Sequence, residues 1–252
     1  MLLRIGQSSF RGAFPRYSRH FSMHEVTAEP GRLPRAPKLK LWREAVPESF
    51  SFAVRFAPSA SELTSPDNVR DALKYALQVA TALEAEWFVL SSPVSVRPTA
   101  RNRARVVELF ESVPSSLKKA WDVGGMWDQE AVASVLDASG AVWSRDLSRA
   151  DDPQSGAVYT RLKDWGNAVR LRSGPAQQLA INILGADEAM VVVDSLYGLP
   201  AKRMLLEELS FGGDDLSDDD MGPPDDYEDE DEEADDDAEE SDDEPSSPAD
   251  DE

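Results

Sequence analysis

The 252-residue sequence contains no cysteine and only two histidines, His20 and His24. The absence of cysteine excludes a disulfide scaffold, thiolate zinc sites, iron–sulfur ligation and cysteine nucleophiles. His-rich metal sites are excluded as well. The sequence also lacks a G-x-G-x-x-G loop, a Walker loop, a G-x-S-x-G elbow and an H-E-x-x-H motif. We therefore expect neither a resident metal nor a cofactor.

Long apolar runs are also missing, since none approaches the roughly 20 residues that a membrane-spanning helix needs. The first 21 residues contain four arginines and no acidic residue, a composition that also occurs in mitochondrial presequences. The run from Leu2 to Ile5, however, favours the start of a buried strand. We therefore expect a soluble, cytoplasmic protein that has no membrane as a partner.

Positive charge is absent from the last part of the chain. Residues 212–252 contain 24 of the 48 acidic residues and no Lys or Arg, which leaves 24 acidic and 26 basic residues, a net charge of +2, in residues 1–211. The last segment has almost no large apolar residues, so it cannot bury enough surface to offset its ordering entropy. We predict a folded domain over 1–211 and a disordered acidic tail over 212–252.

Within residues 1–211, short apolar runs alternate with amphipathic segments, a pattern typical of βαβ units in a parallel sheet. We predict eight strands, over residues 2–9, 24–28, 50–56, 87–92, 118–124, 141–147, 157–163 and 189–195.

The segments between these strands carry helix signals. From residue 68 to 84, apolar residues follow the i, i+3, i+4 pattern, and Ser65-Pro66 suits a cap followed by proline. Asp128 and Gly140 bracket another helix as its N-cap and C′ residues. We predict helices over residues 15–21, 38–46, 68–84, 104–113, 129–139, 176–184 and 200–211.

Only a loop, residues 148–156, separates the sixth and seventh strands. The predicted fold is therefore a short (β/α)8 TIM-type barrel in which one outer helix is reduced. The alternative is a doubly wound open sheet.

The stretch FSMHEVTAEPGRLPRAPKLKLWREAVPESFSFAVRF, residues 21–56, is the most informative in the chain. It resembles the YecE-like family, the domain of unknown function 72 (DUF72), in which F-x-x-V-E-I-N-S-T-F-Y-R-L-P precedes W-x-x-x-x-P-x-x-F-x-F-A-V-K. HEVTAEPGRLP is similar to the first block. Trp42, Pro47, Phe50 and Phe52 match the second block, and Arg55 stands where the family has Lys.

Shorter segments continue the resemblance in the same order. Ile5-Gly6-Gln7-Ser8, FVLSSPVSVRP from Phe88, AWDVGGMW from Ala120, YTRLKDWG from Tyr159 and VVVDS from Val191 each resemble a family segment. The resemblance spans residues 2–211 and implies a (β/α)8 barrel. It implies no known activity, because the family's reaction is not established.

The chain departs from the family pattern at the expected carboxyl ends of the strands. The replaced positions are Thr27 for Asn, Pro30 and Gly31 for Phe-Tyr, Ser91 for Gln, Gly124 and Gly125 for Arg-His, Lys163 for His, and Asp194 and Ser195 for an Asn pair. The family residues that remain are Glu25, Asp122 (for Glu) and Arg161, with Ser8 and Arg55. These departures suggest an altered site.

Glu25, Asp122 and Arg161 are the candidate catalytic residues, because they follow three strands whose carboxyl ends line the mouth of a barrel. Two carboxylates and a guanidinium could serve acid–base chemistry or hold a polar substrate. The alternative is a structural ion-pair network inside the barrel. The same strand ends give the candidate ligand-binding residues: Ser8, Arg55, Ser91, Lys163 and Asp194.

Three other features have structural interpretations. His24 should face away from Glu25 by strand alternation and pack against a helix, whereas His20 should lie on a helix surface. The six tryptophans are interpreted as packing residues. The basic segment 97–105 contains four arginines. It could contact phosphate, but it is more typical of a solvated helix face, so nucleic acid is not the favoured partner.

The sequence thus leaves two functions open. In the first, the barrel mouth binds or converts a small polar or anionic ligand. In the second, the protein is a non-catalytic interaction module whose acidic tail binds basic partners or folds over the barrel to regulate it.

Overall fold

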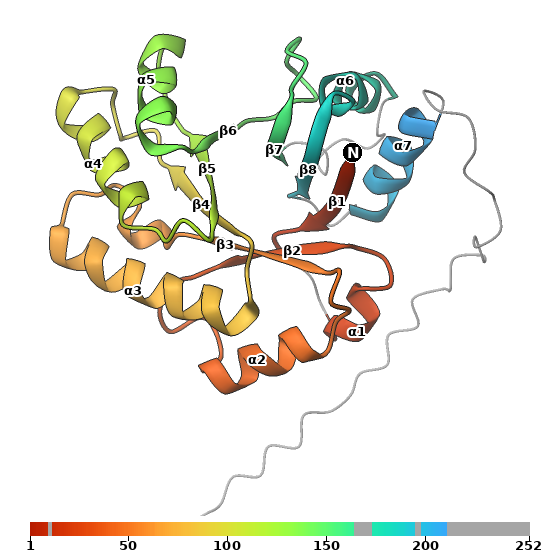
Figure 1. Ribbon diagram of the computed structural model, residues 1–252, viewed down its shortest axis with the longest axis horizontal. Helices are drawn as coiled ribbons and strands as arrows, with labels where there is room; N and C mark the ends of the chain where they lie inside the picture. Colours follow the sequence, from red (N-terminus) through yellow and green to blue (C-terminus); the bar gives the residue numbers. More distant parts are fainter. Residues whose placement is uncertain (10–11, 164–172, 195–197, 211–252) are drawn as a thin grey trace, which may run out of the picture. The chain divides into compact units, whose positions relative to one another are not determined.

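Strands and helices alternate along the chain, and neighbouring helices pack in pairs, α2 with α3, α4 with α5 and α6 with α7 (Figure 1). The computed structural model describes residues 1–9, 12–163, 173–194 and 198–210, all of which fall within one unit, Met1–Asp215. The predicted acidic tail over 212–252 and the predicted Ser195 position lie outside the described residues.

The strands are β1 Leu2–Gln7, β2 Met23–Thr27, β3 Ser51–Arg55, β4 Trp87–Ser92, β5 Lys118–Val123, β6 Val142–Ser144, β7 Gly156–Leu162 and β8 Ala186–Val193. The helices are α1 Phe14–Tyr17, α2 Ala36–Glu44, α3 Pro66–Leu83, α4 Ala100–Glu111, α5 Gln129–Ser139, α6 Ser173–Ile183 and α7 Gly198–Ser210, with one 3-10 turn at Pro58–Ala60. All eight predicted strands and all seven predicted helices are present.

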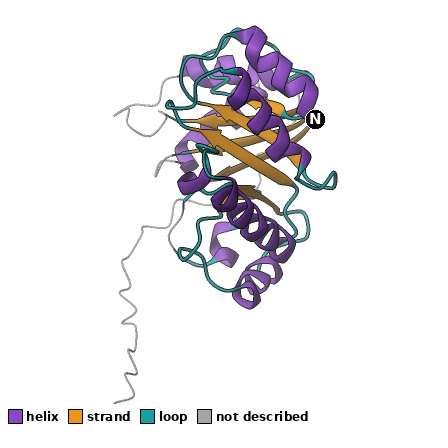
Figure 2. Ribbon diagram, turned by 90° about the vertical axis from the view of Figure 1, so that its left-hand side faces the viewer, coloured by secondary structure: helices purple, strands orange, loops and turns teal. Residues whose placement is uncertain are grey.

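The strands form a single parallel sheet in the order β6-β5-β4-β3-β2-β1-β8-β7. Strands β1 to β5 each pair with the next strand in sequence, β7 pairs with β8, and β8 returns to pair with β1 along its length. An isolated parallel bridge between Arg145 and Thr160 joins the two ends of the sheet. The fold is therefore a nearly closed barrel, as predicted, and the doubly wound sheet is rejected. Helices lie outside the strands on both sides in Figure 2.

Local capping explains where several helices begin and end. Asp128 accepts a hydrogen bond from the backbone N–H of Ala131 at 2.7 Å, and Gly140 ends α5 with φ +66°, a conformation that glycine adopts without strain. Ser65 occupies the predicted N-cap position of α3 with Pro66 after it, but its side chain makes no capping hydrogen bond. The predicted cap is thus correct in position only.

The connection from β6 to β7 contains no helix, which confirms the predicted loss of one outer helix. Its backbone is held instead by Asn182, a fully buried residue of α6. The Asn182 amide donates to the carbonyls of Leu147 (2.7 Å) and Ala150 (2.6 Å) and accepts from the N–H of Asp152 (3.1 Å). One side chain thereby satisfies three backbone groups of a loop that has no helical hydrogen bonds.

Side chains alternate between two cores along each strand, because successive residues of a strand point to opposite faces. The larger core contains Phe52, Val54, Phe88 and Leu90 and lies between strands and helices. The smaller core fills the barrel interior with side chains that register places on one face: Met23, Ala53, Trp87, Val89, Ala120, Tyr159, Met190 and Val192.

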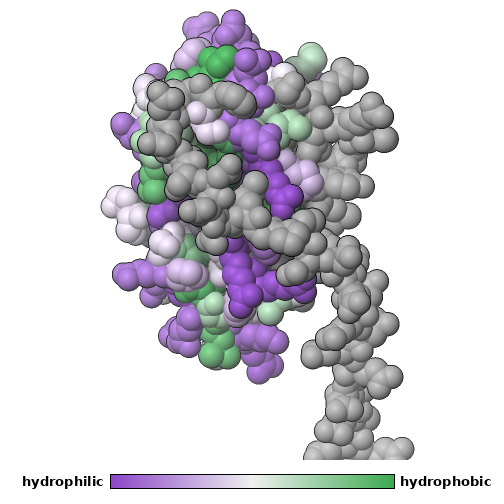
Figure 3. Space-filling model, turned by 90° about the vertical axis from the view of Figure 1, so that its right-hand side faces the viewer, coloured by the Kyte–Doolittle hydropathy of each residue, from purple (hydrophilic) through white to green (hydrophobic). Residues whose placement is uncertain are grey.

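No helix among the described residues is long and apolar enough to cross a membrane. On the face shown in Figure 3, hydrophobic residues occur as small separate groups among hydrophilic ones. Scattered exposed hydrophobic residues are ordinary on a protein surface and do not by themselves mark an interface.

Candidate functional site

The eight predicted site residues all belong to the set of side chains that point into the barrel. The alternation that places Met23, Val89 and Tyr159 in the inner core continues toward the carboxyl ends of the strands. It reaches Ser8, Glu25, Arg55, Ser91, Asp122, Arg161, Lys163 and Asp194. Because the strands are parallel, these ends meet at one mouth, which is the face where TIM barrels carry their active sites.

Glu25 and Arg161 form the centre of this group. Arg161 Nη1 donates a hydrogen bond to Oε1 of Glu25, and the Tyr159 hydroxyl donates to Oε2 at 2.8 Å. The Glu25 side chain is 0% exposed and that of Arg161 is 2% exposed. Two buried opposite charges are thus paired, and both Glu25 oxygens are hydrogen-bonded, as a buried carboxylate requires.

Arg161 also links the centre to two further carboxylates. Its Nη2 lies 3.1 Å from Oδ2 of Asp194. The other oxygen of Asp194, Oδ1, accepts a 2.6 Å hydrogen bond from the Ser8 hydroxyl. Arg161 Nε lies 3.9 Å from Oδ2 of Asp122. The single guanidinium therefore faces three carboxylates that come from β2, β5 and the end of β8.

Asp122 connects Arg161 to Lys163 and Ser91. Lys163 Nζ lies 2.7 Å from Oδ1 of Asp122, and the Ser91 hydroxyl donates to Oδ2 at 3.2 Å. All eight predicted residues are thus joined in one network once Arg55 is included, whose Nε is 3.8 Å from Oε1 of Glu25. The structure brings together every candidate that the sequence predicted, although it does not test their roles.

Arg55 differs from the other cations of the network. Its side chain is 23% exposed and makes no hydrogen bond with the described residues. Its Nε is buried, as is Nε of Arg161, and neither Nε has a hydrogen-bond partner among the described residues. The 3.8 Å contact between Arg55 Nε and Glu25 balances the charge of Arg55 but is too long for a hydrogen bond. Arg161 and Lys163, in contrast, both have carboxylate partners within 3.1 Å. The spare donors of Arg55 at the mouth are therefore its Nη groups.

Charges and exposure divide the network into two tiers. Three cations, Arg55, Arg161 and Lys163, balance the three carboxylates of Glu25, Asp122 and Asp194. Glu25 and Arg161 form the buried lower tier. Lys163 and Asp194, with side chains 51% and 41% exposed, belong with Arg55 to an upper tier that solvent or a ligand can reach.

The environment of the network fixes the protonation of three groups. Burial, reinforced by Glu25, raises the pKa of Tyr159 well above its ordinary value, so its hydroxyl remains a donor. Burial alone would lower the pKa of Arg161, but Glu25 and its other anionic neighbours raise it. Burial would raise the pKa of Asp194, but the hydrogen bond from Ser8 and the charge of Arg161 lower it.

Sequence reasoning missed Tyr159, which completes the hydrogen bonding of Glu25. The alternation Tyr159, Arg161, Lys163 along β7 was the available signal, since it places all three side chains on the inner face. Sequence reasoning also missed a charged layer at the opposite end of the barrel. There Arg4 lies 2.6 Å from Glu86, and Lys118 pairs with Glu188.

Gly124 and Gly125 stand where the backbone leaves no room for side chains. A Cβ at Gly124 would lie 2.2 Å from the carbonyl oxygen of Ser92, and one at Gly125 would lie 3.0 Å from that of Val94. Gly125 also has φ +80°. The loops after β4 and β5 thus pack backbone against backbone, so that only glycine fits at these two positions.

His24 packs against a helix, as predicted. Its ring is 5.5 Å from that of Phe14 and 5.4 Å from that of Tyr17, both on α1. Burial lowers the pKa of His24 to about 4, so its imidazole is neutral at pH 7. His20 is exposed but follows α1 in a turn rather than lying on the helix.

A pocket of about 520 Å³ opens beside the mouth and shares Ser8, Thr27 and Arg55 with it. Its outer wall is formed by α2, through Trp42, and by the segment that joins β2 to α2. A volume of this size is within the range of small-molecule sites. The spare donors of Arg55 therefore face a space that a ligand could occupy.

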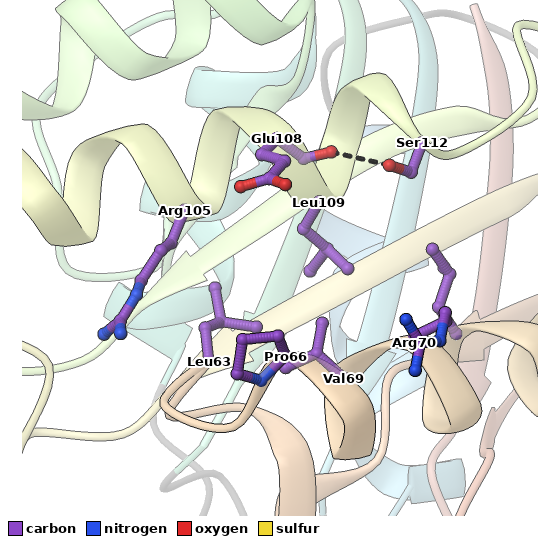
Figure 4. A pocket seen from close by; sticks show the side chains of 9 residues that line it. Leu63, Pro66, Val69, Arg70, Arg105, Glu108, Leu109 and Ser112 are labelled. Carbon is purple, nitrogen blue, oxygen red and sulfur yellow. Dashed lines mark hydrogen bonds between the residues drawn. The ribbon is translucent and has the colours of Figure 1, made fainter.

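A second pocket, of about 340 Å³, lies between α3 and α4, away from the strand ends. Figure 4 shows Leu63, Pro66 and Val69 at its centre, with Arg105 and Arg70 on either side of them. Ligand sites combine an apolar surface with polar groups that converge. The two guanidinium groups do not converge here, so the pocket beside the mouth is the better candidate.

Within the described ranges, no group of three or more His, Asp or Glu side chains is placed to hold a metal ion. The charged groups of the mouth act instead on one another, through the ion pairs given above.

Comparison with known proteins gives no match to a protein-family profile or to a curated protein. Solved structures do match. A DUF72 family protein from Enterococcus faecalis has a TM-score of 0.64 and 15% identity, with 89% of this chain and 99% of that chain covered. A DUF72 family protein from Thermotoga maritima has a TM-score of 0.62 and 14% identity, with 84% and 99% covered.

A D-psicose 3-epimerase structure determined in the presence of D-fructose matches less closely, with a TM-score of 0.54, 15% identity and 84% and 92% of the chains covered. The chain thus has the TIM-barrel fold of the DUF72 structures. This agrees with the family resemblance that the sequence predicts over residues 2–211, and the low identity agrees with a divergent sequence.

Proposed function

We propose that this barrel, which has the fold of the DUF72 proteins, binds a small anionic ligand at the carboxyl ends of its strands. The observation that carries this proposal is the environment of Arg55. Its Nη groups make no hydrogen bond with the described residues, and its side chain is only 23% exposed and lines the 520 Å³ pocket beside the mouth. A guanidinium presents a planar set of donors that matches carboxylate and phosphate groups.

The charge of the pocket also favours an anion. Two arginines, Arg32 and Arg55, line it against a single carboxylate, Glu29. Glu29 already accepts a 2.5 Å hydrogen bond from the Ser59 hydroxyl and makes no ion pair with either arginine among the described contacts. His24, with its pKa at about 4, adds no charge at pH 7. Among the lining residues the cations therefore outnumber the carboxylates by one, with Arg55 also facing the carboxylate of Glu25 below the pocket.

The buried tier of the network has a positioning role in this proposal. Glu25 is held by Arg161 and Tyr159 and faces Nε of Arg55 at 3.8 Å. It thereby fixes the orientation of the Arg55 side chain without neutralising its outer donors. Neither Glu25 nor Arg161 is exposed to a ligand. The catalytic roles predicted for Glu25, Asp122 and Arg161 stay predictions, as do ligand contacts of Ser8, Ser91, Lys163 and Asp194.

Isothermal titration calorimetry of the full chain with inorganic phosphate and with acetate tests this proposal. We expect binding that is lost, or weakened at least tenfold, in Arg55→Gln. Arg101→Gln is the matched control, because Arg101 is exposed on the basic segment that opens α4 and carries the same charge. Binding that persists in Arg55→Gln but is lost in Arg101→Gln would contradict the proposal and assign anion binding to that segment.

The alternative function, in which the acidic tail binds basic partners or folds over the barrel, depends on residues 212–252. These lie outside the described residues, so the alternative stays a prediction, as does the cytoplasmic location.

A further inference from the structure

The pocket beside the mouth is more polar than a site for an apolar ligand would be. Four hydroxyl side chains line it, those of Ser8, Ser9, Thr27 and Ser59. The hydroxyls of Ser8 and Ser59 already donate to Asp194 and Glu29, but an apolar ligand body would cover those of Ser9 and Thr27 without offering them partners, and each unpartnered polar group costs binding free energy. The lining therefore selects a ligand whose body carries its own hydrogen-bonding groups in addition to an anionic group.

Glu29 provides a fixed acceptor in this pocket. Its Oε1 accepts from the Ser59 hydroxyl at 2.5 Å, and its Oε2 lies 3.4 Å from the Ser59 backbone nitrogen. Ser59 is itself anchored, because the Asn68 side chain donates to its carbonyl oxygen at 3.2 Å. The carboxylate is thus held in one orientation and keeps lone pairs for further donors. Hydroxyl groups would satisfy these lone pairs, whereas a second anion would be repelled.

One wall of the pocket is apolar and includes an aromatic ring. Trp42 is half-buried, and its ring is supported from behind by Phe14, with ring centroids 4.9 Å apart. Leu33 and Val26 extend this surface. The pocket therefore combines a supported indole with hydroxyl and carboxylate groups. Such a combination suits a compact ring that has an apolar C–H face and polar edges.

We propose that the ligand is an anionic sugar, either a sugar phosphate or a sugar acid. This inference rests on the proposed function, since Arg55 holds the anionic group. Glu29 accepts hydrogen bonds from the ring hydroxyls, and Trp42 packs against the ring face. Phosphate and carboxylate share the chemistry that Arg55 recognises, and the two sources are separated by experiment.

The test is calorimetric titration of the full chain with hexose 6-phosphates and hexuronates, beside inorganic phosphate, acetate and neutral hexoses. We expect at least one anionic sugar to bind tenfold or more tightly than the free anion of its class, phosphate or acetate. Whether it is a phosphate or a uronate distinguishes the two sources. Neutral hexoses should bind more weakly than the corresponding anionic sugars.

Two variants identify the residues responsible. Glu29→Gln should reduce the affinity for the anionic sugar about tenfold without reducing that for the free anion, because the carboxylate accepts hydrogen bonds only from the sugar ring. Trp42→Leu should have the same effect, and circular dichroism checks that it remains folded. Glu29 is partly exposed, so Glu29→Gln keeps the test decisive if Trp42→Leu unfolds.

The outcomes separate this inference from the proposed function. If free phosphate or acetate binds in an Arg55-dependent way, but no anionic sugar binds more tightly, the sugar inference is overturned and the anion site stands. A tighter-binding sugar that is unaffected by Glu29→Gln likewise overturns the inference. If neither the free anions nor the sugars bind, both proposals fail.

Discussion

Replacing Arg161 by methionine tests whether the network at the mouth is one interdependent structure. The substitution removes a guanidinium that is 2% exposed and leaves Glu25, 0% exposed, without its closest counter-charge. Removing one partner of a buried ion pair typically costs about 3–5 kcal/mol, because an uncompensated charge stays buried. Methionine has a comparable volume, so the loss of packing contributes little.

The structure places the expected value at the lower end of that range. Glu25 keeps its 2.8 Å hydrogen bond from Tyr159 and its 3.8 Å contact with Arg55. Asp194 is 41% exposed, so water replaces Arg161 there at small cost. We expect a loss of about 3 kcal/mol in the free energy of unfolding. In a domain of this size that corresponds to roughly 6–12 °C in the melting temperature.

Urea unfolding of the full chain at pH 7, followed by circular dichroism, measures this loss. The control is Arg161→Met combined with Glu25→Gln, in which the buried carboxylate is neutral. We expect the double variant to be more stable than Arg161→Met alone, because the buried charge has been removed. A loss below about 1 kcal/mol in Arg161→Met, or a double variant less stable than the single one, would refute the reasoning.

Two further predictions concern stability away from the mouth. The pKa of His24 is about 4 in the folded chain against 6.5 for the free group. Between these two pH values the unfolded chain binds more protons than the folded chain, so the free energy of unfolding decreases as the pH falls from 6.5 to 4. In urea unfolding across this range, His24→Phe should remove roughly 3 kcal/mol of that loss, whereas a variant of the exposed His20 should retain it. Asn182→Ala should lower the free energy of unfolding by about 3 kcal/mol, because buried backbone groups between β6 and β7 lose their partners. The exposed Gln177 of the same helix provides the control; an equal effect of Gln177→Ala would contradict the account of this connection.

The fold could be predicted because its strands and helices follow local rules. The caps at Asp128 and Gly140 and the stripe of α3 depend only on nearby residues. The absence of a helix between β6 and β7 was visible in the loop composition of residues 148–156. The hydrogen bonds that hold this connection in place of a helix could not be predicted, because Asn182 lies some 30 residues further along the chain and is simply one polar residue in an apolar segment.

The ion-pair network at the mouth could be predicted apart from Tyr159, since strand alternation places every candidate on the inner face, but Glu29 and Arg32 of the pocket were not predicted. The energetics of the network could not be predicted. Whether Arg161 or Arg55 keeps spare donors depends on distances between β2, β3, β7 and β8, which no local pattern contains. Trp42 was interpreted as a packing residue, and its ring does contact Phe14, but it also lines the pocket. Trp42 thus both packs against Phe14 and lines the pocket, and the sequence pattern alone shows only the first of these roles.

The most direct measurement for the central claim is the NMR signal of the Arg55 guanidinium Nη–H groups in the full chain, assigned by comparison with Arg55→Gln. Titration with inorganic phosphate or acetate should shift this signal in a saturable way with at least one of the two anions, while the Nη–H signals of Arg161, already hydrogen-bonded to Glu25 and Asp194, change little. An Arg55 signal that stays unchanged at saturating concentrations of both anions would contradict the account.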